Sequence, residues 1–408
     1  MLNGRPPEHF LPNRAYDPPA HPARLNLTLS LSPIISLGIG RFAYALVLPD
    51  MRESLHWSYS AAGFMNTVNA AGYLLGALIA SRLIRRIGWS ATVRGGTLAA
   101  LASLAVCGTT DHFLILSLAR LVAGIGAGVA FVAGGALAAR VAQSRPAQAS
   151  FILSLFYAGP PLGIVASGLV APFVLQAYGP GSWWIVWLAL TALGTVLAVP
   201  LMLTPIPAAA AVPDGDGRAF SLRPMAIYLV SYFLYGAGYI AYLTFMIAYV
   251  RDLGGGAAAQ SAFWCLIGIA GFTTPWVWRR VLALDRGGVP AAIILTVNAI
   301  GAILPVLGHS PVMLALSAAV FGIAFSTVTT TTTAFVRFNT PPAAWPRAIA
   351  ALTIVFGIGQ TLGPFVVGAI TDALGSLDTA LNVSAALLLL AAVMATLQGK
   401  LKRTDRAL

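Results

Sequence analysis

Twelve stretches of this sequence are each about as long and as apolar as a helix that crosses a lipid bilayer, which needs about 20 mostly apolar residues. Charged residues make up only 9% of the chain, against about 25% in soluble globular domains. A soluble fold could not bury this much apolar surface, so the sequence predicts an all-α integral membrane protein. The stretches lie near 27–48, 60–80, 91–109, 113–139, 150–175, 183–203, 223–250, 258–278, 288–308, 311–336, 347–371 and 379–398.

The basic residues indicate how these spans are oriented. Twenty of the 24 Lys and Arg residues fall in segments on the side of the N-terminus, and two, Arg52 and Arg251, fall on the other side. Lys and Arg concentrate in the cytoplasmic segments of membrane proteins. We therefore expect a multi-pass protein of the cell inner (plasma) membrane with both termini in the cytoplasm. The net charge of +12 then reflects topology, and no nucleic-acid partner is expected.

One long polar segment divides the spans into six and six. The predicted organisation is a disordered cytosolic N-terminal tail (1–26), a six-helix bundle (27–203), a central cytosolic loop (204–222), a second six-helix bundle (223–398) and a cytosolic C-terminal tail (399–408). The proline-rich start lacks the apolar core of a signal peptide. The two cysteines lie in separate apolar runs and are interpreted as small buried side chains.

The two halves also resemble each other in sequence. "GIGRFAY" (Gly38–Tyr44) and "GAGYIAY" (Gly236–Tyr242) match at an offset of 198 residues. The same offset places Leu118, Gly124 and Ile125 over Leu316, Gly322 and Ile323. Two six-span halves in the same orientation are typical of parallel repeats related by an axis along the membrane normal.

Three motifs carry a resemblance to a known family. "RLVAGIGAG" (Arg120–Gly128) resembles the fourth-helix motif of the major facilitator superfamily, and "GPPLG" (Gly159–Gly163) is similar to the end of its antiporter motif. "GIGRFAY" resembles the YbfB/YjiJ-type branch. The resemblance implies a monomeric secondary transporter, without a cofactor, that moves a small molecule by alternating access. The loop after the second span lacks the family's usual acidic residue, so its charged gate is not implied.

Two arginines lie inside predicted spans, each roughly 10 Å from the outer side. A charge within a span costs at least ~2.5 kcal/mol and normally faces a cavity or a partner. Because no carboxylate lies in a span interior, Arg41 and Arg120 predict an anionic substrate. For Arg41 the alternative is snorkelling toward Asp50 or Glu53. For Arg120 the family motif leaves helix packing or gating equally open.

Tyrosines recur along one face of the seventh span. The positions 228, 232, 235, 239 and 242 fall within about 80° of one helix face. An aromatic belt would place tyrosines only at the membrane edges. We therefore expect a water-facing stripe, with packing as the alternative.

Neutral polar side chains in other spans complete the candidate site. Asn66, Asn69 and Tyr73 share one face of the second span, Gln360 lies in the eleventh, and the tenth carries the threonine-rich run 326–333. The predicted substrate-binding residues are Arg41, Tyr44, Asn66, Asn69, Tyr73, Tyr235, Tyr239, Tyr242 and Gln360. The predicted gating or coupling residues are Arg120, Gly159, Pro160 and Asp50.

Other function classes fit less well. An enzyme needs a nucleophile, a base or a metal cluster. The five histidines lie in tails or at loop edges, and the sequence has no Walker loop. We expect no enzymatic activity, no metal and no cofactor. The predicted function is secondary transport of a small organic anion, such as an organic or sugar acid, with or without a proton. The alternatives are proton-coupled export of drugs or metabolites, a channel, and a membrane-embedded enzyme.

Overall fold

The structure, a computed structural model, describes residues 21–206, 221–341 and 344–401. Within these ranges, 11 helical stretches are long and apolar enough to cross a membrane. One of them, Tyr59–Cys107, has 49 residues and is two helices that meet at a kink. It therefore supplies two spans, which gives twelve. The prediction of an all-α membrane protein is confirmed.

The first six spans contain several breaks in regular helix. The first span is divided among an α-helix, a π-helical segment and a second α-helix, and the fifth is also interrupted. The elements are α1 (Pro22–Pro33), η1 (Ile34–Phe42), α2 (Tyr44–Ser54), α3 (Tyr59–Cys107), α4 (Phe113–Gln143), η2 (Pro146–Gln148), α5 (Ala149–Tyr157), α6 (Gly159–Tyr178) and α7 (Trp183–Leu203).

The last six spans are more regular, apart from the tenth, which consists of two helices. The elements are η3 (Arg223–Met225), α8 (Ala226–Asp252), α9 (Ala257–Val277), α10 (Arg279–Leu282), α11 (Val289–Leu307), α12 (Pro311–Phe325), α13 (Thr327–Asn339), α14 (Trp345–Leu374) and α15 (Leu377–Leu397). Proline at the first turn, as in α12, suits a helix start because its missing N–H has no partner there anyway.

Gly88 joins the second and third spans. Its φ of 81° and ψ of 169° lie outside the helical region and are accessible to glycine without a Cβ clash. The second span was expected to end near residue 80. The helix instead continues through the arginine-rich segment to Gly88, where the chain reverses direction without a loop.

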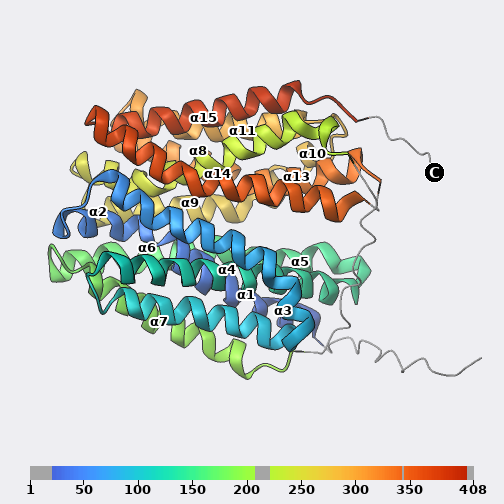
Figure 1. The fold of residues 1–408 in the computed structure, drawn as a ribbon, viewed down its shortest axis with the longest axis horizontal. Helices are drawn as coiled ribbons and strands as arrows, with labels where there is room; N and C mark the ends of the chain where they lie inside the picture. The colour runs from blue at the N-terminus through green and yellow to red at the C-terminus, as the bar shows by residue number, and fades with distance from the viewer. Residues whose placement is uncertain (1–20, 207–220, 342–343, 402–408) are drawn as a thin grey trace, which may run out of the picture.

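The helices form two groups (Figure 1). The elements from α1 to α7, called the N-half here, lie in the lower part of the view, and those from α8 to α15, called the C-half, lie in the upper part. The two halves pack against each other through α3 on α14, α6 on α9 and α2 on α8. A functional site between the halves must therefore involve these helices and the π-helical segment beside them.

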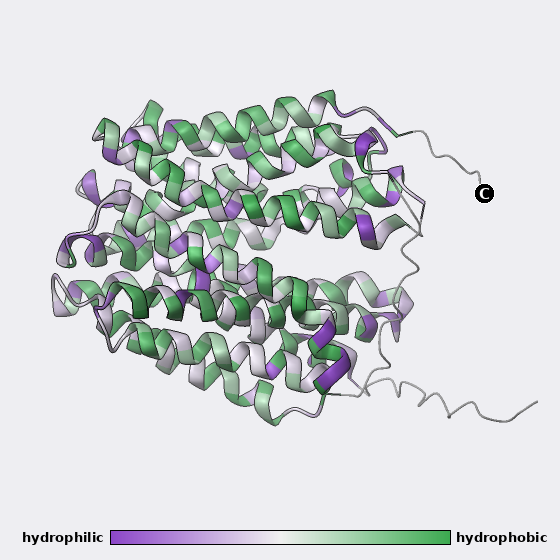
Figure 2. Cartoon of the chain, in the orientation of Figure 1, coloured by the Kyte–Doolittle hydropathy of each residue, from purple (hydrophilic) through white to green (hydrophobic). Residues whose placement is uncertain are grey.

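The outward faces of the helices are apolar. Leu203 and Val196, for example, expose 75% and 69% of their surface. Hydrophobic residues cover the length of the bundle, and hydrophilic ones gather at its two ends (Figure 2). In water such a surface would drive association, whereas in a bilayer it contacts lipid chains.

Close helix packing in the N-half depends on glycine. A Cβ on Gly124 of α4 would lie 2.0 Å from the carbonyl oxygen of Asn69 in α3. Small residues let the backbones of membrane helices approach to van der Waals contact. The spaced glycines of the fourth span thus act as a packing surface for α3.

Part of the predicted domain organisation lies outside the described residues. This applies to residues 1–20 of the N-terminal tail, 207–220 of the central loop and 402–408 of the C-terminal tail. Their expected disorder and cytosolic location stay predictions.

Candidate functional site

The first span is irregular where it carries Arg41. The segment Ile34–Phe42 is π-helical and contains Gly38 and Gly40. A Cβ on Gly38 would lie 2.3 Å from the Cα of Gly163, so this segment packs directly on α6. π-Helical turns are rare and frequently occur at functional sites. This one places the Arg41 side chain where the two halves meet.

Arg41 contacts the C-half. It is 3% exposed, and its Nη2 donates a hydrogen bond to Oε1 of Gln360 in α14. The same Oε1 accepts a hydrogen bond of 2.6 Å from the hydroxyl of Tyr239 in α8. The guanidinium carbon lies 4.8 Å from the centre of the Tyr73 ring in α3, a cation–π distance. The buried cation therefore has a neutral amide as its hydrogen-bond partner.

Two polar atoms of this pair have no partner. The Nε atom of Arg41 and the Nε2 atom of Gln360 are buried and lack hydrogen bonds within the described residues. Gln360 is 1% exposed. A buried donor without an acceptor is destabilising, and such groups require an explanation in a native structure. Both atoms are donors, so an acceptor between the halves would satisfy them.

Arg120 has a different environment, although it lies at a similar depth. It is 2% exposed, and its Nη1 and Nη2 donate to the carbonyl oxygens of Gly40 at 2.7 Å and Arg41 at 3.3 Å. Its guanidinium carbon lies 4.9 Å from the Tyr44 ring and 5.7 Å from the Trp187 ring. Arg120 thus anchors the backbone of the π-helical segment inside the N-half.

The predicted residues of the second span have separate partners. Asn66 Nδ2 donates to Thr244 Oγ1 of α8 at 2.6 Å, which links the two halves. Asn69 Nδ2 donates to the carbonyl oxygen of Arg120 at 2.9 Å. Of the three polar residues on this face, Tyr73 is the one that contacts Arg41.

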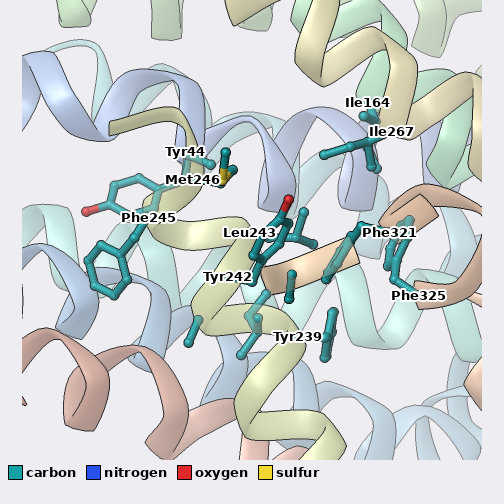
Figure 3. Packing of buried hydrophobic residues seen from close by; sticks show 14 of the residues in the cluster. Tyr44, Ile164, Tyr239, Tyr242, Leu243, Phe245, Met246, Ile267, Phe321 and Phe325 are labelled. Atoms are coloured by element: carbon teal, nitrogen blue, oxygen red, sulfur yellow. The ribbon is translucent and has the colours of Figure 1, made fainter. Parts of the chain in front are cut away.

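The tyrosines of α8 share one face, but that face packs within the C-half. All five rings are buried, and four of the hydroxyls bond to neighbours in the C-half. Tyr235 donates to the carbonyl oxygen of Phe325, and Tyr242 and Ser317 share a hydrogen bond of 2.5 Å. Figure 3 shows Tyr239 and Tyr242 beside Phe321 and Phe325. In this structure the stripe is buried, as in the packing alternative, and its Tyr239 reaches the junction of the halves through Gln360. A water-facing role for the stripe stays a prediction.

Tyr44 and Asp50 also lie away from Arg41's partners. The Tyr44 hydroxyl donates to the carbonyl oxygen of Ala62 at 2.7 Å. The two Asp50 carboxylate oxygens accept from the backbone N–H groups of Gly181 and Trp183, each at 2.9 Å, at the start of α7. A carboxylate at a helix N-terminus is a favourable cap. Snorkelling of Arg41 toward Asp50 is therefore not observed.

The "GPPLG" motif forms a packing surface for the first span. Pro160 lies in the first turn of α6. A Cβ on Gly159 would lie 2.6 Å from the Pro33 side chain. The motif thus holds the first span close to the fifth.

Sequence reasoning missed several aromatic residues near Arg41. Phe356 stacks on Tyr239 with ring centres 5.7 Å apart and planes at 9°. Phe42 meets Phe325 edge-to-face at 6.4 Å, across the two halves. Phe356 precedes Gln360 by four residues, so helical spacing alone could have placed it on the same face.

The halves are also linked at the end of the bundle that carries the turns near residues 55–58, 179–182 and 253–256, here called the outer end. Arg251 and Glu53 form an ion pair of 2.5 Å. The Asp372 carboxylate of α14 accepts from the backbone N–H groups of Tyr59 at 2.7 Å and Ser60 at 2.8 Å, at the start of α3. At the same end, a cavity of about 260 Å³ lies beside Arg251, between residues of both halves.

Asp372→Asn is expected to loosen the outer end, because a neutral amide has one oxygen acceptor for two N–H donors. The measurement is the rate at which a thiol reagent modifies a cysteine introduced by Leu46→Cys. Leu46 lines the cavity, and the two native cysteines, Cys107 and Cys265, are replaced by alanine. We expect a roughly 3- to 10-fold faster reaction, since a hydrogen bond contributes about 1 kcal/mol. Asp378→Asn is the matched control, because Asp378 bonds to Tyr249 within the C-half. Equal rates in the two variants would contradict the link.

Comparisons with known proteins point to one family. The sequence profile of the family described as "Uncharacterised MFS-type transporter YbfB" matches residues 33–396. The chain is also similar to the uncharacterized MFS-type transporter YceJ of Bacillus subtilis (strain 168), with 25% identity over 230 residues. That match spans 53% of this chain and 56% of the length of YceJ.

Solved structures of transporters share the fold. A bacterial homologue of the human lysosomal transporter Spinster, in an inward-facing and occupied conformation, superposes with a TM-score of 0.68 at 16% identity, over 93% of this chain and 97% of that one. A mutant form of the nucleoside transporter NupG superposes with a TM-score of 0.72 at 14% identity, over 92% and 98%. At these identities the likeness concerns the fold alone.

Proposed function

The chain belongs to the YbfB family of MFS-type transporters, and from this membership and the surroundings of Arg41 we propose that it transports a small organic anion by alternating access. Members of this superfamily are secondary transporters, and the chain is a multi-pass membrane protein. The anionic substrate is the proposal. The observation that carries it is a buried arginine, at the junction of the two halves, whose hydrogen-bond partner is a neutral amide.

The chemistry of the pair favours an anion. A carboxylate on the guanidinium would accept charge-assisted hydrogen bonds, which are roughly twice as strong as neutral ones. It would replace the Gln360 oxygen on Arg41 and could accept from the unpaired Arg41 Nε and Gln360 Nε2. The Gln360 amide oxygen thus bonds to Arg41 in the place that a substrate oxygen would take.

The position of the site favours coupling to alternating access. Arg41 belongs to the N-half, and Gln360 and Tyr239 belong to the C-half. In transporters built from two repeats, the substrate binds near the bilayer midplane between them, and the halves rock around it. A ligand held by both halves binds more tightly to the conformation in which the halves are close. It therefore shifts the equilibrium toward that conformation.

The other predicted residues take supporting roles in this proposal. Tyr73 and Tyr239 line the site, and Asn66 joins the halves beside it. Arg120, with Tyr44 and Asn69, holds the π-helical segment that presents Arg41. The remaining residues position helices around the site: Tyr235, Tyr242, Gly159, Pro160 and Asp50.

The proposed orientation places both termini and the central loop in the cytoplasm of a cell whose plasma membrane holds the protein. The distribution of Lys and Arg supports it. A reporter fused after Leu408 is expected to be active only in its cytosolic form. Activity of an extracytoplasmic reporter at that position would contradict the orientation.

The test of the substrate class is a thermal-shift screen of the purified protein against organic acids, sugars and organic cations. An organic acid is expected to raise the melting temperature. Arg41→Gln should weaken its apparent affinity roughly 10- to 100-fold, because a hydrogen bond to a charged group contributes about 1.5–3 kcal/mol. Arg41→Lys should lose less, since it keeps the charge without the planar fork.

Arg337→Gln is the control, because it removes the same charge from an exposed position on α13. It should leave the affinity unchanged. Stabilisation by a sugar or a cation, with the same affinity in wild type and Arg41→Gln, would reject the anion proposal.

A further inference from the structure

The neutral donors near Arg41 are mostly occupied. The Nδ2 of Asn66 bonds to Thr244, and that of Asn69 bonds to the Arg120 backbone. The Tyr235 and Tyr242 hydroxyls bond within the C-half. The buried Oδ1 atoms of Asn66 and Asn69 have no partner among the described residues and could each accept from one ligand hydroxyl. A ligand with several hydroxyl groups would still find few free donors, and each unpaired buried hydroxyl weakens binding.

The second of the two intramembrane arginines bonds to the backbone of its own half through both Nη atoms, and its buried Nε has no partner among the described residues. The Arg120 guanidinium donates to the carbonyl oxygens of Gly40 and Arg41 and lies against the Tyr44 and Trp187 rings. Of these two guanidinium groups, only that of Arg41 bonds across the junction of the halves, so a second carboxylate between the halves would lack a cation there. Burial of the second carboxylate without a charged partner is strongly unfavourable. The site therefore fits a single negative charge.

Aromatic rings lie over the Arg41 guanidinium and continue from it into the C-half. Five of them, which we call the ring cluster, come from both halves of the protein. Two lie over the guanidinium, with centres at 4.8 and 5.9 Å. Of the other three, one contacts Phe42, one bonds to Gln360, and the third stacks on that second ring. The cluster consists of Tyr73, Phe42, Tyr239, Phe325 and Phe356.

Movement of the halves would open this cluster. Phe42 belongs to the N-half and Phe325 to the C-half, and their rings meet edge-to-face at 6.4 Å. Separation of the halves, which alternating access requires, would part these two rings beside Arg41 and expose their faces. Aromatic rings prefer stacked or edge-to-face contacts with other rings over contacts of equal area with saturated groups.

We propose that the substrate is an aromatic monocarboxylate, whose carboxylate binds Arg41 and Gln360 while its ring packs in the ring cluster. This inference rests on the proposed function and narrows its substrate class. Every organic acid offers the same carboxylate. The inference therefore predicts that differences in affinity between acids come from the part of the molecule outside the carboxylate. Saturated, polyhydroxylated and doubly charged acids should all bind more weakly.

The experiment measures the melting temperature of the purified full-length protein against the concentration of five acids. Benzoate and phenylacetate carry a ring and one charge, cyclohexanecarboxylate is the saturated counterpart of benzoate, gluconate is polyhydroxylated, and terephthalate adds a second carboxylate. The two aromatic monocarboxylates are expected to bind about tenfold more tightly than the other three. Phe325→Leu should remove most of this preference. The melting temperature of the variant without ligand is the control that shows whether it is folded.

The outcomes separate this inference from the proposed function. If gluconate, terephthalate or cyclohexanecarboxylate binds as tightly as benzoate and Arg41→Gln abolishes that binding, the aromatic assignment is wrong and the anion site stands. If no acid shifts the melting temperature, or if benzoate acts equally on wild type and Arg41→Gln, both proposals fail. If Phe325→Leu keeps the full preference for aromatic acids, the aromatic ring of the acid does not bind in the ring cluster.

Discussion

Arg120→Gln is expected to lower the free energy of unfolding by about 3–6 kcal/mol, because it removes two hydrogen bonds from a charged donor and leaves two carbonyls short of a partner. These are the bonds to Gly40 and Arg41, within the π-helical segment. Proteins are stable by only about 5–15 kcal/mol. The measurement is the yield of monodisperse protein after detergent extraction, together with its melting temperature.

Arg41→Gln is the matched control for that prediction. It removes the same charge at a similar depth, but glutamine at this position can still bond to Gln360, so the protein should fold. Arg120→Lys should recover part of the stability, since it keeps a charged donor without the two-pronged geometry. If Arg120→Gln folds as well as Arg41→Gln but no longer binds an acid, then Arg120 contacts substrate, as its place in the sequence allowed.

Gly124→Ala is expected to destabilise the protein by about 3 kcal/mol, the upper part of the range for overpacking. The new Cβ would lie 2.0 Å from the Asn69 carbonyl oxygen and 2.9 Å from the Tyr73 backbone nitrogen. Backbone atoms cannot rotate out of the way, so α3 and α4 must move apart. Because α3 carries Tyr73, the same shift should weaken binding at Arg41.

Gly95→Ala provides the opposite sign. A Cβ on Gly95 meets nothing within 4 Å, and the residue is exposed on a helix. Replacing glycine with alanine inside a helix stabilises it by roughly 0.5–1 kcal/mol. Thermal unfolding of the two variants should therefore move in opposite directions. Equal melting temperatures would show that the fourth-span glycines do not set the helix separation.

Some parts of the site were predictable from sequence because they depend on local properties. A charge within an apolar span is visible in one dimension, so Arg41 and Arg120 were both found. Their different roles were not, because the direction of each side chain depends on how its helix is rotated against its neighbours. Asp50 was a candidate partner for Arg41. It caps α7 instead, through residues more than 130 positions further along the chain.

The tyrosine stripe illustrates the same limit. Helical periodicity correctly placed the five tyrosines on one face of the seventh span. It could not tell what lies opposite that face, and the structure places the tenth and eleventh spans there. The helix that continues to Gly88 was missed because hydropathy locates apolar segments and carries no information on where a polar helix ends.

The sequence alone predicted an all-α protein that crosses a membrane twelve times, in two halves of similar sequence, with most of its basic residues on one side. The spans follow from sums of transfer free energies over neighbouring residues, the sidedness from the positions of Lys and Arg, and the halves from a repeat in the sequence. None of these needs knowledge of the fold. The tertiary structure decided which polar groups meet. Arg41 and Gln360 are 319 residues apart, and their contact exists only because the two halves pack face to face. That packing brings the Arg41 guanidinium to the C-half, whereas the Arg120 guanidinium bonds to the backbone of its own half.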